Sequence, residues 1–272
     1  MKSTDDSALL DAARRGDRSA LDALLERHAP QIYRFGMRMC RDPELAKEVL
    51  QDTLLAAARG VRDFRGNSSL STWLFAIARS FCGKLRRRSG APARALDDAA
   101  SELARIADPA HPPDEALASK EVAHALEGAI AALDPMYREV FILRDVEGLT
   151  AAEVAQVVGA SEQAIKSRLH RARLAVRQRL APLLGGAEPG PTPGAARCPD
   201  VLRLYSRHLE GEISAGVCAR MERHVADCTH CRATCDSLTR TLALCKAAPG
   251  QSVPIAVQDS VRSAIRELLP AW

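Results

Sequence analysis

Two proline-rich or glycine-rich interruptions constrain most strongly what this chain can fold into. The stretch 89–117, SGAPARALDDAASELARIADPAHPPDEAL, loses helical periodicity, and the stretch 185–197, GGAEPGPTPGAAR, has no apolar pattern that could be buried. Together they divide the 272 residues into parts near the lower end of the usual domain size. We expect domains at 1–88, 118–184 and 198–245, joined by these two linkers and followed by a tail, 246–272.

The composition favours helices throughout. Aromatic residues make up only 4% of the chain, while Ala, Leu and Arg recur in every part of it. We therefore predict an all-α protein. The polar start, MKSTDDSALLDAARRGD, lacks the apolar core of a signal peptide, and no stretch approaches 18 uninterrupted apolar residues. The expected location is the cytoplasm.

The first domain combines amphipathic helices with a strongly basic segment. Residues 42–59 read as a helix with Asp42 as N-cap and Pro43 at the first helical position. Residues 64–88 predict another, in which Ser71 and Thr72 can act as caps. Between residues 64 and 96 no acidic residue occurs, whereas seven basic ones do. A polyanion such as single-stranded nucleic acid suits this segment, and the alternative is a solvated helix end with its aromatic rings in the core.

Residues 148–180 of the second domain predict a helix-turn-helix. Thr150 and Glu153 form a capping box, Gly159 permits a left-handed turn, and Ser161 caps a second helix. That helix displays six cations against the single acid Glu162; they are Lys166, Arg168, Arg171, Arg173, Arg177 and Arg179. Such a helix is typical of one that reads the DNA major groove through its N-terminal residues.

Long strings within residues 8–184 resemble an RNA polymerase sigma factor of the extracytoplasmic-function (ECF) group. They are DPELAKEVLQDTLL, FRGNSSLSTWLFAIARS, LDPMYREVFILRDVEGLTAAEVAQVVG and KSRLHRAR. The resemblance implies that core RNA polymerase and promoter DNA are the partners. It also implies that the first domain is sigma region 2, which captures the melted minus-ten element, and that the second is region 4, which reads the minus-thirty-five element.

The resemblance also assigns roles to individual residues. Those facing polymerase would be Glu48, Gln51 and Asp52. Those near the non-template strand would be Phe64, Asn67, Ser68, Ser80, Lys84 and Arg87. Those reading the minus-thirty-five element would be Glu162, Gln163, Lys166, Ser167, Arg168 and Arg171. Ser80 stands where family members often have Asn, and Gln163-Ala164-Ile165 replaces a commoner Gly-Thr-Val, so the promoter sequence is left open.

Six of the eight cysteines fall between residues 198 and 245. A disulfide framework is unusual in the cytoplasm, so clustered cysteines there indicate a metal site or reactive thiols. The spacing of Cys198, His224, Cys228 and Cys231 predicts a Cys3His tetrahedral set suited to zinc. The surrounding strings, YSRHLEGEIS and RHVADCTHC, are similar to the zinc-binding fold of anti-sigma factors.

Three further cysteines in this part of the chain, Cys218, Cys235 and Cys245, are candidates for metal sensing by ligand exchange or at a second site. The chain also resembles CorE-type sigma factors, whose cysteine-rich domain senses transition metals. This resemblance implies metal-dependent activity, with zinc, copper or cadmium as the sensed ion. The 13-residue linker 185–197, with a reach of about 20 Å if flexible, would let the domain contact the sigma domains of the same chain. The alternative for these three cysteines is packing in a core, which is also our interpretation of Cys40 and Cys82.

Other readings remain open at the C-terminal end. The domain can hold a purely structural zinc, or it can be controlled by thiol oxidation. His208 and His230 are accessory ligands or solvent-exposed. A tail helix, 256–269, can pack on region 2, on region 4 or on the zinc module. An enzyme is not expected, because no general base accompanies the metal ligands and neither a phosphate-binding glycine loop nor a nucleophile elbow is present.

Overall fold

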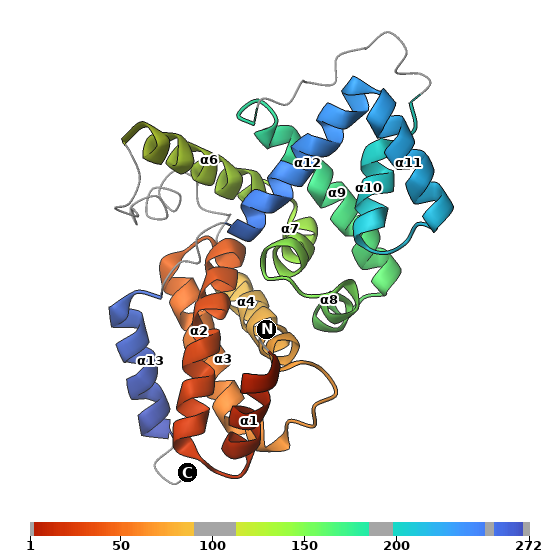
Figure 1. Ribbon diagram of the computed structural model, residues 1–272. Helices are drawn as coiled ribbons and strands as arrows, with labels where there is room; N and C mark the ends of the chain where they lie inside the picture. The colour runs from red at the N-terminus through yellow and green to blue at the C-terminus, as the bar shows by residue number, and fades with distance from the viewer. Residues whose placement is uncertain (1–2, 90–112, 185–197, 248–252, 269–272) are drawn as a thin grey trace. The chain divides into compact units, whose positions relative to one another are not determined.

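The computed structural model describes residues 3–89, 113–184, 198–247 and 253–268 (Figure 1). Within these ranges every regular element is a helix, which confirms the predicted all-α class. The chain forms two compact units. The first comprises residues 1–95 and 249–272 together with 156–158, and the second comprises 96–155 and 159–248.

The first unit is a bundle built on three long helices. Its elements are α1 (Ser3–Arg14), α2 (Arg18–Cys40), α3 (Pro43–Gly60), the short helix η1 (Val61–Asp63), α4 (Leu70–Ser89) and α13 (Ile255–Leu268). The apolar faces of α2, α3 and α4 meet in a core where Phe35 and Phe75 contact edge to face, with ring centroids 5.5 Å apart. Both rings are fully buried, as are Ile32 and Leu50 beside them.

Local capping fixes where these helices begin. The Asp42 carboxylate accepts hydrogen bonds from the N–H groups of Glu44 and Leu45, as predicted for the start of α3. Helix α4 begins earlier than expected. Ser69 caps it, because the Ser69 hydroxyl accepts the N–H of Thr72 at 3.2 Å, so the expectation that Ser71 or Thr72 is the cap was wrong.

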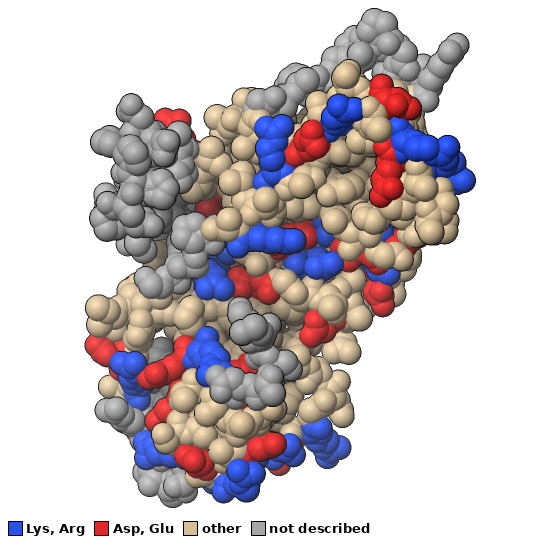
Figure 2. Space-filling view, in the orientation of Figure 1, with Lys and Arg blue, Asp and Glu red and all other residues tan. Residues whose placement is uncertain are grey.

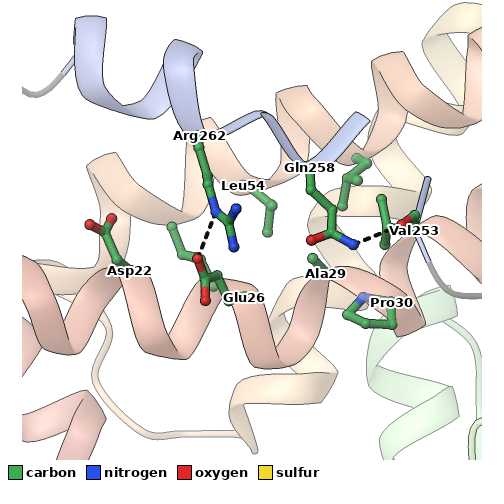
Figure 3. A pocket seen from close by; sticks show the side chains of 10 residues that line it. Asp22, Glu26, Ala29, Pro30, Leu54, Val253, Gln258 and Arg262 are labelled. Atoms are coloured by element: carbon green, nitrogen blue, oxygen red, sulfur yellow. Dashed lines mark hydrogen bonds and ion pairs between the residues drawn. The ribbon is translucent and has the colours of Figure 1, made fainter. Parts of the chain in front are cut away.

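The last helix of the chain, α13, belongs to the first unit and packs against α3. Val257 and the preceding Val253 are buried there, while Arg262 forms an exposed ion pair with Glu26 of α2 at 2.8 Å. Val253, Arg262 and Glu26 are among the side chains that line a hollow of about 250 Å³ between α2, α3 and the 253–262 segment. Figure 3 shows how these side chains lie around it. Of the three positions that the sequence left open for the tail helix, the structure selects the first domain.

The second unit holds the helix-turn-helix and the cysteine-rich segment. Its elements are α6 (Pro113–Ala131), α7 (Pro135–Phe141), the π-helical turn η2 (Ile142–Val146), α8 (Ala151–Val158), α9 (Glu162–Leu180), α10 (Val201–Leu209), α11 (Ala215–Asp227) and α12 (Thr229–Ala247). Helix α6 begins inside the segment expected to be a linker, at a proline suited to a first helical turn.

The predicted turn chemistry of the helix-turn-helix is present. Thr150 and Glu153 form the reciprocal capping box of α8, and Ser161 caps α9 by accepting the N–H of Ala164. Gly159 ends α8 with φ 70°, a left-handed conformation that a side chain would strain. Helix α9 then lies against α6, α7, α10 and α12, so it is the central helix of this unit.

The described part of the chain contains no helix that is both long enough and apolar enough to cross a bilayer.

Candidate nucleic-acid interface and metal centre

The N-terminal half of α9 carries all six residues predicted to read DNA in region 4. Four of them are exposed: Glu162, Gln163, Ser167 and Arg171. The other two, Lys166 and Arg168, are partly buried. The Arg171 guanidinium donates a hydrogen bond to the Tyr137 hydroxyl of α7 at 3.0 Å. A helix with these polar side chains exposed at its first turns can enter a major groove.

Two acids from the cysteine-rich segment reach α9. They are Glu210 and Glu212, which flank Gly211 in the turn between α10 and α11. The Lys166 ammonium lies 2.7 Å from Glu162 on its own helix and 3.5 Å from Glu212. The hydrogen bond to Glu162 and the charges of both carboxylates raise the pKa of Lys166.

Arg173 of α9 is the centre of a buried ion network. Its guanidinium makes a bidentate pair with Asp145 of η2, at 2.7 and 2.8 Å, and its Nη2 also lies 2.7 Å from Glu210. The other oxygen of Glu210 accepts from Arg144 at 3.1 Å, and Arg173 donates to the backbone carbonyl and hydroxyl of Ser206 in α10. Burial opposes the charge, but the hydrogen bonds that Arg173 donates to Asp145 and Glu210, together with the negative charges of these two carboxylates, outweigh it and raise the pKa of Arg173.

This network corrects one expectation from the sequence. Arg173 and Arg177 were expected on the displayed face of the recognition helix, yet only 1% and 5% of their surfaces are exposed. Arg173 is buried because Asp145 and Glu210 neutralise it, and burial lowers the pKa of Arg177. Sequence reasoning missed Asp145, Glu210 and Glu212, although the two glutamates, separated only by Gly211, stand in the quoted string YSRHLEGEIS.

The predicted strand-binding residues of the first unit lie in the loop before α4 and in the second half of that helix. Asn67, Ser80, Lys84 and Arg87 are exposed and Ser68 is partly exposed, whereas Phe64 is 8% exposed. The Phe64 ring packs on Trp73 with centroids 5.0 Å apart, so it supports the loop and is covered in this state. The Lys84 ammonium lies 5.0 Å from the centre of the Phe81 ring, a cation–π contact.

The predicted polymerase-facing residues lie on α3. Glu48 is exposed, and Gln51 and Asp52 are partly buried. Asp52 lines a shallow hollow together with Lys84, Arg87 and Arg88 of α4 and two apolar side chains. On the face seen in Figure 2, basic and acidic side chains are interspersed among the described residues rather than gathered into a field of one sign.

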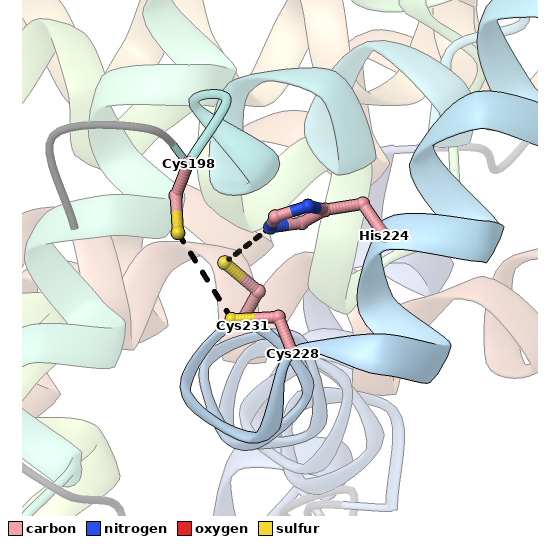
Figure 4. A group of neighbouring side chains, drawn as sticks. All are labelled: Cys198, His224, Cys228 and Cys231. Carbon is pink, nitrogen blue, oxygen red and sulfur yellow. Dashed lines mark hydrogen bonds between the residues drawn. The ribbon is translucent and has the colours of Figure 1, made fainter. Parts of the chain in front are cut away.

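Four side chains converge in the C-terminal module as the spacing predicted. Cys198 precedes α10, His224 lies on α11, Cys228 ends α11, and Cys231 lies on α12. Their ligand atoms all lie within 4.8 Å of one another (Figure 4). The Sγ atoms of Cys198 and Cys228 are 4.0 Å apart, and His224 Nε2 is 3.2 Å from Cys231 Sγ.

This set fits zinc. Zinc–sulfur bonds of about 2.3 Å and zinc–nitrogen bonds of about 2.0–2.1 Å give a tetrahedron with edges of roughly 3.5–3.8 Å, close to the separations observed. Burial raises the pKa of Cys231 to about 12, whereas the backbone N–H of Cys231 lowers the pKa of Cys228. A bound cation favours the thiolate form of both.

The remaining cysteines divide into packed and accessible thiols. Cys235 and Cys245 are 7% and 1% exposed, and Cys235 packs with Val201 and Cys231 in a small apolar cluster. Burial raises the pKa of Cys235, which keeps its thiol protonated. Cys40 and Cys82 pack between α2 and α4, where their sulfur atoms are 2.9 Å apart, so neither lies alone.

Cys218 lies on α11, where it is only partly buried and has polar neighbours. Its neighbours are His208 of α10 and Glu222 one turn further along α11. His230, the other possible accessory ligand, is partly buried at the start of α12 and does not belong to the four-residue cluster.

Three segments of the chain match known protein families. Residues 24–91 match the family described as Sigma-70 region 2, residues 123–176 match Sigma-70, region 4, and residues 198–232 match a putative zinc-finger family. The class of protein is therefore a sigma factor, a transcription initiation factor rather than an enzyme.

Comparison with individual proteins indicates which group of sigma factors the chain resembles. The chain is 35% identical over 181 residues to the ECF RNA polymerase sigma factor SigM of Mycobacterium tuberculosis, covering 66% of this chain and 85% of that protein. It is 29% identical over 184 residues to the RNA polymerase sigma-H factor of Pseudomonas aeruginosa, covering 66% and 95%. A solved structure of CnrH in complex with the cytosolic domain of CnrY covers 68% of this chain and 99% of that one, with a TM-score of 0.48 at 24% identity. This chain belongs to the ECF sigma factor family.

Proposed function

We propose that this ECF sigma factor carries its own regulator, and that the zinc-finger module covering about residues 198–245 controls region 4 of the same chain. The observation that carries the proposal is the set of ion pairs from Glu210 and Glu212 to α9 and to Arg144. A module that only stored zinc would have no need of buried charges matched to the recognition helix. These pairs support a docked state in which the module competes with DNA for α9.

The competition acts through charge and through access. A lysine that neutralises a DNA phosphate contributes by releasing counterions, and Lys166 paired with Glu212 is less free to do so. The buried pair between Arg173 and Glu210 keeps α10 against the flank of α9. Promoter reading through region 4 is therefore expected to be weaker in the docked state than in a chain without the module.

The remaining roles are those implied by the family. Region 2 contacts core RNA polymerase through α3, at Glu48, Gln51 and Asp52. It meets the non-template strand through the predicted α4 and loop residues, with Lys84 and Arg87 as phosphate contacts and Asn67, Ser68 and Ser80 beside them. Phe64 is available to a base only after it leaves Trp73. A protein that acts with core polymerase on promoter DNA is expected in the cytoplasm.

Zinc held by Cys198, His224, Cys228 and Cys231 would cross-link the segment before α10 to α11 and α12. The chain's own residues then do the regulatory work, since the α10–α11 turn presents its two glutamates only if both helices are in place. A purely structural zinc remains the alternative to metal sensing, and the burial of Cys235 and Cys245 favours it for those two thiols. Sensing of copper, cadmium or zinc in the CorE manner therefore depends on Cys218.

The sigma activity is tested by transcription from a cognate promoter with added core polymerase. An Arg168→Ala, Arg171→Ala double variant should lose promoter-specific transcript, because each direct base contact contributes about 1–3 kcal/mol. A control with the same change of charge is Arg220→Ala, Arg223→Ala, at exposed positions of α11. Equal transcript from both double variants would contradict the assignment of α9.

A further inference from the structure

A second group of metal-ligating side chains lies on the outer side of the C-terminal module, apart from the four-residue zinc cluster. Cys218 Sγ is 3.5 Å from Nδ1 of His208 and 3.3 Å from Oε1 of Glu222. His208 and Glu222 are exposed and Cys218 is partly buried, so an ion in solution can reach all three. The group joins two helices, because His208 ends α10 while Cys218 and Glu222 lie one turn apart on α11.

We infer that His208, Cys218 and Glu222 form a second metal site, which takes a thiophilic divalent cation such as zinc or cadmium. A thiolate, an imidazole and a carboxylate are all ligands for such ions, at bond lengths of about 2.0–2.3 Å. Two of these ligands on one tetrahedral ion lie roughly 3.5 Å apart. The two separations from Cys218 Sγ already match this value, whereas His208 and Glu222 are not gathered with Cys218 into a set with all ligand atoms within 4.8 Å of one another, so Glu222 has to rotate to complete the site.

Three protein ligands leave the fourth position to water, so this is an open site. The zinc cluster, in contrast, has four protein ligands and Cys231 buried among them. Glu222 is exposed and can rotate towards the ion without disturbing a core. The second site should therefore exchange its ion with solution more readily than the first.

The site is connected to region 4 through the turn between α10 and α11. The two helices that it joins are connected by the turn that holds Glu210 and Glu212 against Arg173, Arg144 and Lys166. An ion shifts a balance between two states only by binding one of them better. In the docked geometry Cys218 already lies close to both His208 and Glu222, and rotation of the exposed Glu222 side chain completes the site, so the ion favours docking and lowers promoter binding. This consequence rests on the proposed function, and its sign is opposite to the metal-dependent activity implied by the CorE resemblance.

The site is tested by counting metal ions on the intact chain, without polymerase or DNA. Purified protein is equilibrated with excess cadmium, freed of unbound ion, and measured by elemental analysis and native mass spectrometry. We expect two ions per wild-type chain and one per Cys218→Ser chain, with His208→Gln binding the second ion on the order of tenfold more weakly. The matched controls, Cys40→Ser and His230→Gln, should each keep two ions.

Alkylation of the same samples identifies the thiol. Cadmium should protect Cys218 from iodoacetamide in the wild-type chain, as read by peptide mass spectrometry. One ion on the wild-type chain, or two ions on the Cys218→Ser chain, would overturn the site. Neither result depends on transcription, so failure of the site is distinguishable from failure of the proposed regulation. The regulation is tested separately, by transcription with a Glu210→Gln, Glu212→Gln chain and with a chain truncated after Gly186.

Discussion

Arg173 of region 4 forms a buried ion pair with Glu210 of the C-terminal module. Its guanidinium is buried with Asp145 and Glu210, and all three side chains are at most 6% exposed. Breaking a buried pair leaves an uncompensated charge, which costs about 3–5 kcal/mol. We predict that Arg173→Met lowers the free energy of unfolding of the second unit by about this amount, measured by urea unfolding.

The control for Arg173 is Arg179, an exposed arginine on the same helix. The variant Arg179→Met removes the same charge from a solvated position and should change the unfolding free energy by less than about 0.5 kcal/mol. Equal effects of the two variants would mean that the network contributes nothing to stability.

His170 of α9 gives the second unit a pH dependence. Burial lowers the pKa of His170 below its ordinary value; the charges around it are Asp200 and Arg203 of α10, together with Arg171 and Arg173 of its own helix. The unfolded chain therefore takes up a proton at a higher pH than the folded chain does. Stability from this residue is fully present above about pH 6.5 and is lost as the pH falls below that value.

We predict that the stability of the wild-type second unit decreases between about pH 6.5 and pH 5. His170→Gln should flatten this part of the profile, measured as urea midpoints across the pH range. An unchanged slope in the variant would show that other groups cause the loss.

At the scale of the elements, α13 is held to the first unit mainly by apolar contact. Val257 is 9% exposed, whereas the ion pair between Arg262 and Glu26 is exposed on both sides. Surface ion pairs contribute about 0–1 kcal/mol, and placing a charge in an apolar contact costs more. We predict that Val257→Asp releases α13, seen as faster amide exchange in residues 255–268, while Arg262→Ala leaves its exchange nearly unchanged.

The helices of this chain were largely predictable because their signals are local. Asp42, Thr150 and Ser161 cap helices within three residues of themselves, and Gly159 supplies the turn conformation that its neighbours need. The convergence of Cys198, His224, Cys228 and Cys231 was predictable for a similar reason, since three of the four lie within eight residues and thiols and imidazole have few other uses at that spacing.

The docking of the module onto α9 was not predictable in the same way. Arg173 pairs with Asp145 and Glu210 at separations of 28 and 37 residues, and nothing local distinguishes it from the exposed Arg171 two residues before it. The proximity of Cys40 and Cys82, 42 residues apart, has the same origin, because only the packing of α2 on α4 brings them together.

For the whole molecule, the C-terminal module should depend on its metal while region 4 does not. Four candidate ligands from three separate segments would make zinc binding part of the folding of residues 198–247. We predict that a strong chelator unfolds this module, with loss of helical circular dichroism and rapid amide exchange in α10, α11 and α12. Helices α7, α8 and α9 should keep their protection, and loss of protection in all six together would contradict an independent module.

The C-terminal helix α13 belongs to the same compact unit as the N-terminal helices α1 to α4. Region 2 is therefore associated with the end of the chain and region 4 with the zinc module.

The central claim, that the docked module restrains region 4, is tested most directly by transcription with a chain that cannot make the charge contacts. The Glu210→Gln, Glu212→Gln double variant keeps the Asp145 pair of Arg173 but removes both glutamate charges from α9. Its control, Asp236→Asn, Glu267→Gln, changes the net charge equally at exposed positions. With core polymerase and a cognate promoter, we predict more transcript from the Glu210, Glu212 variant and from a chain truncated after Gly186 than from the wild type, and no change in the control. Equal or lower transcript from both altered chains would contradict the account.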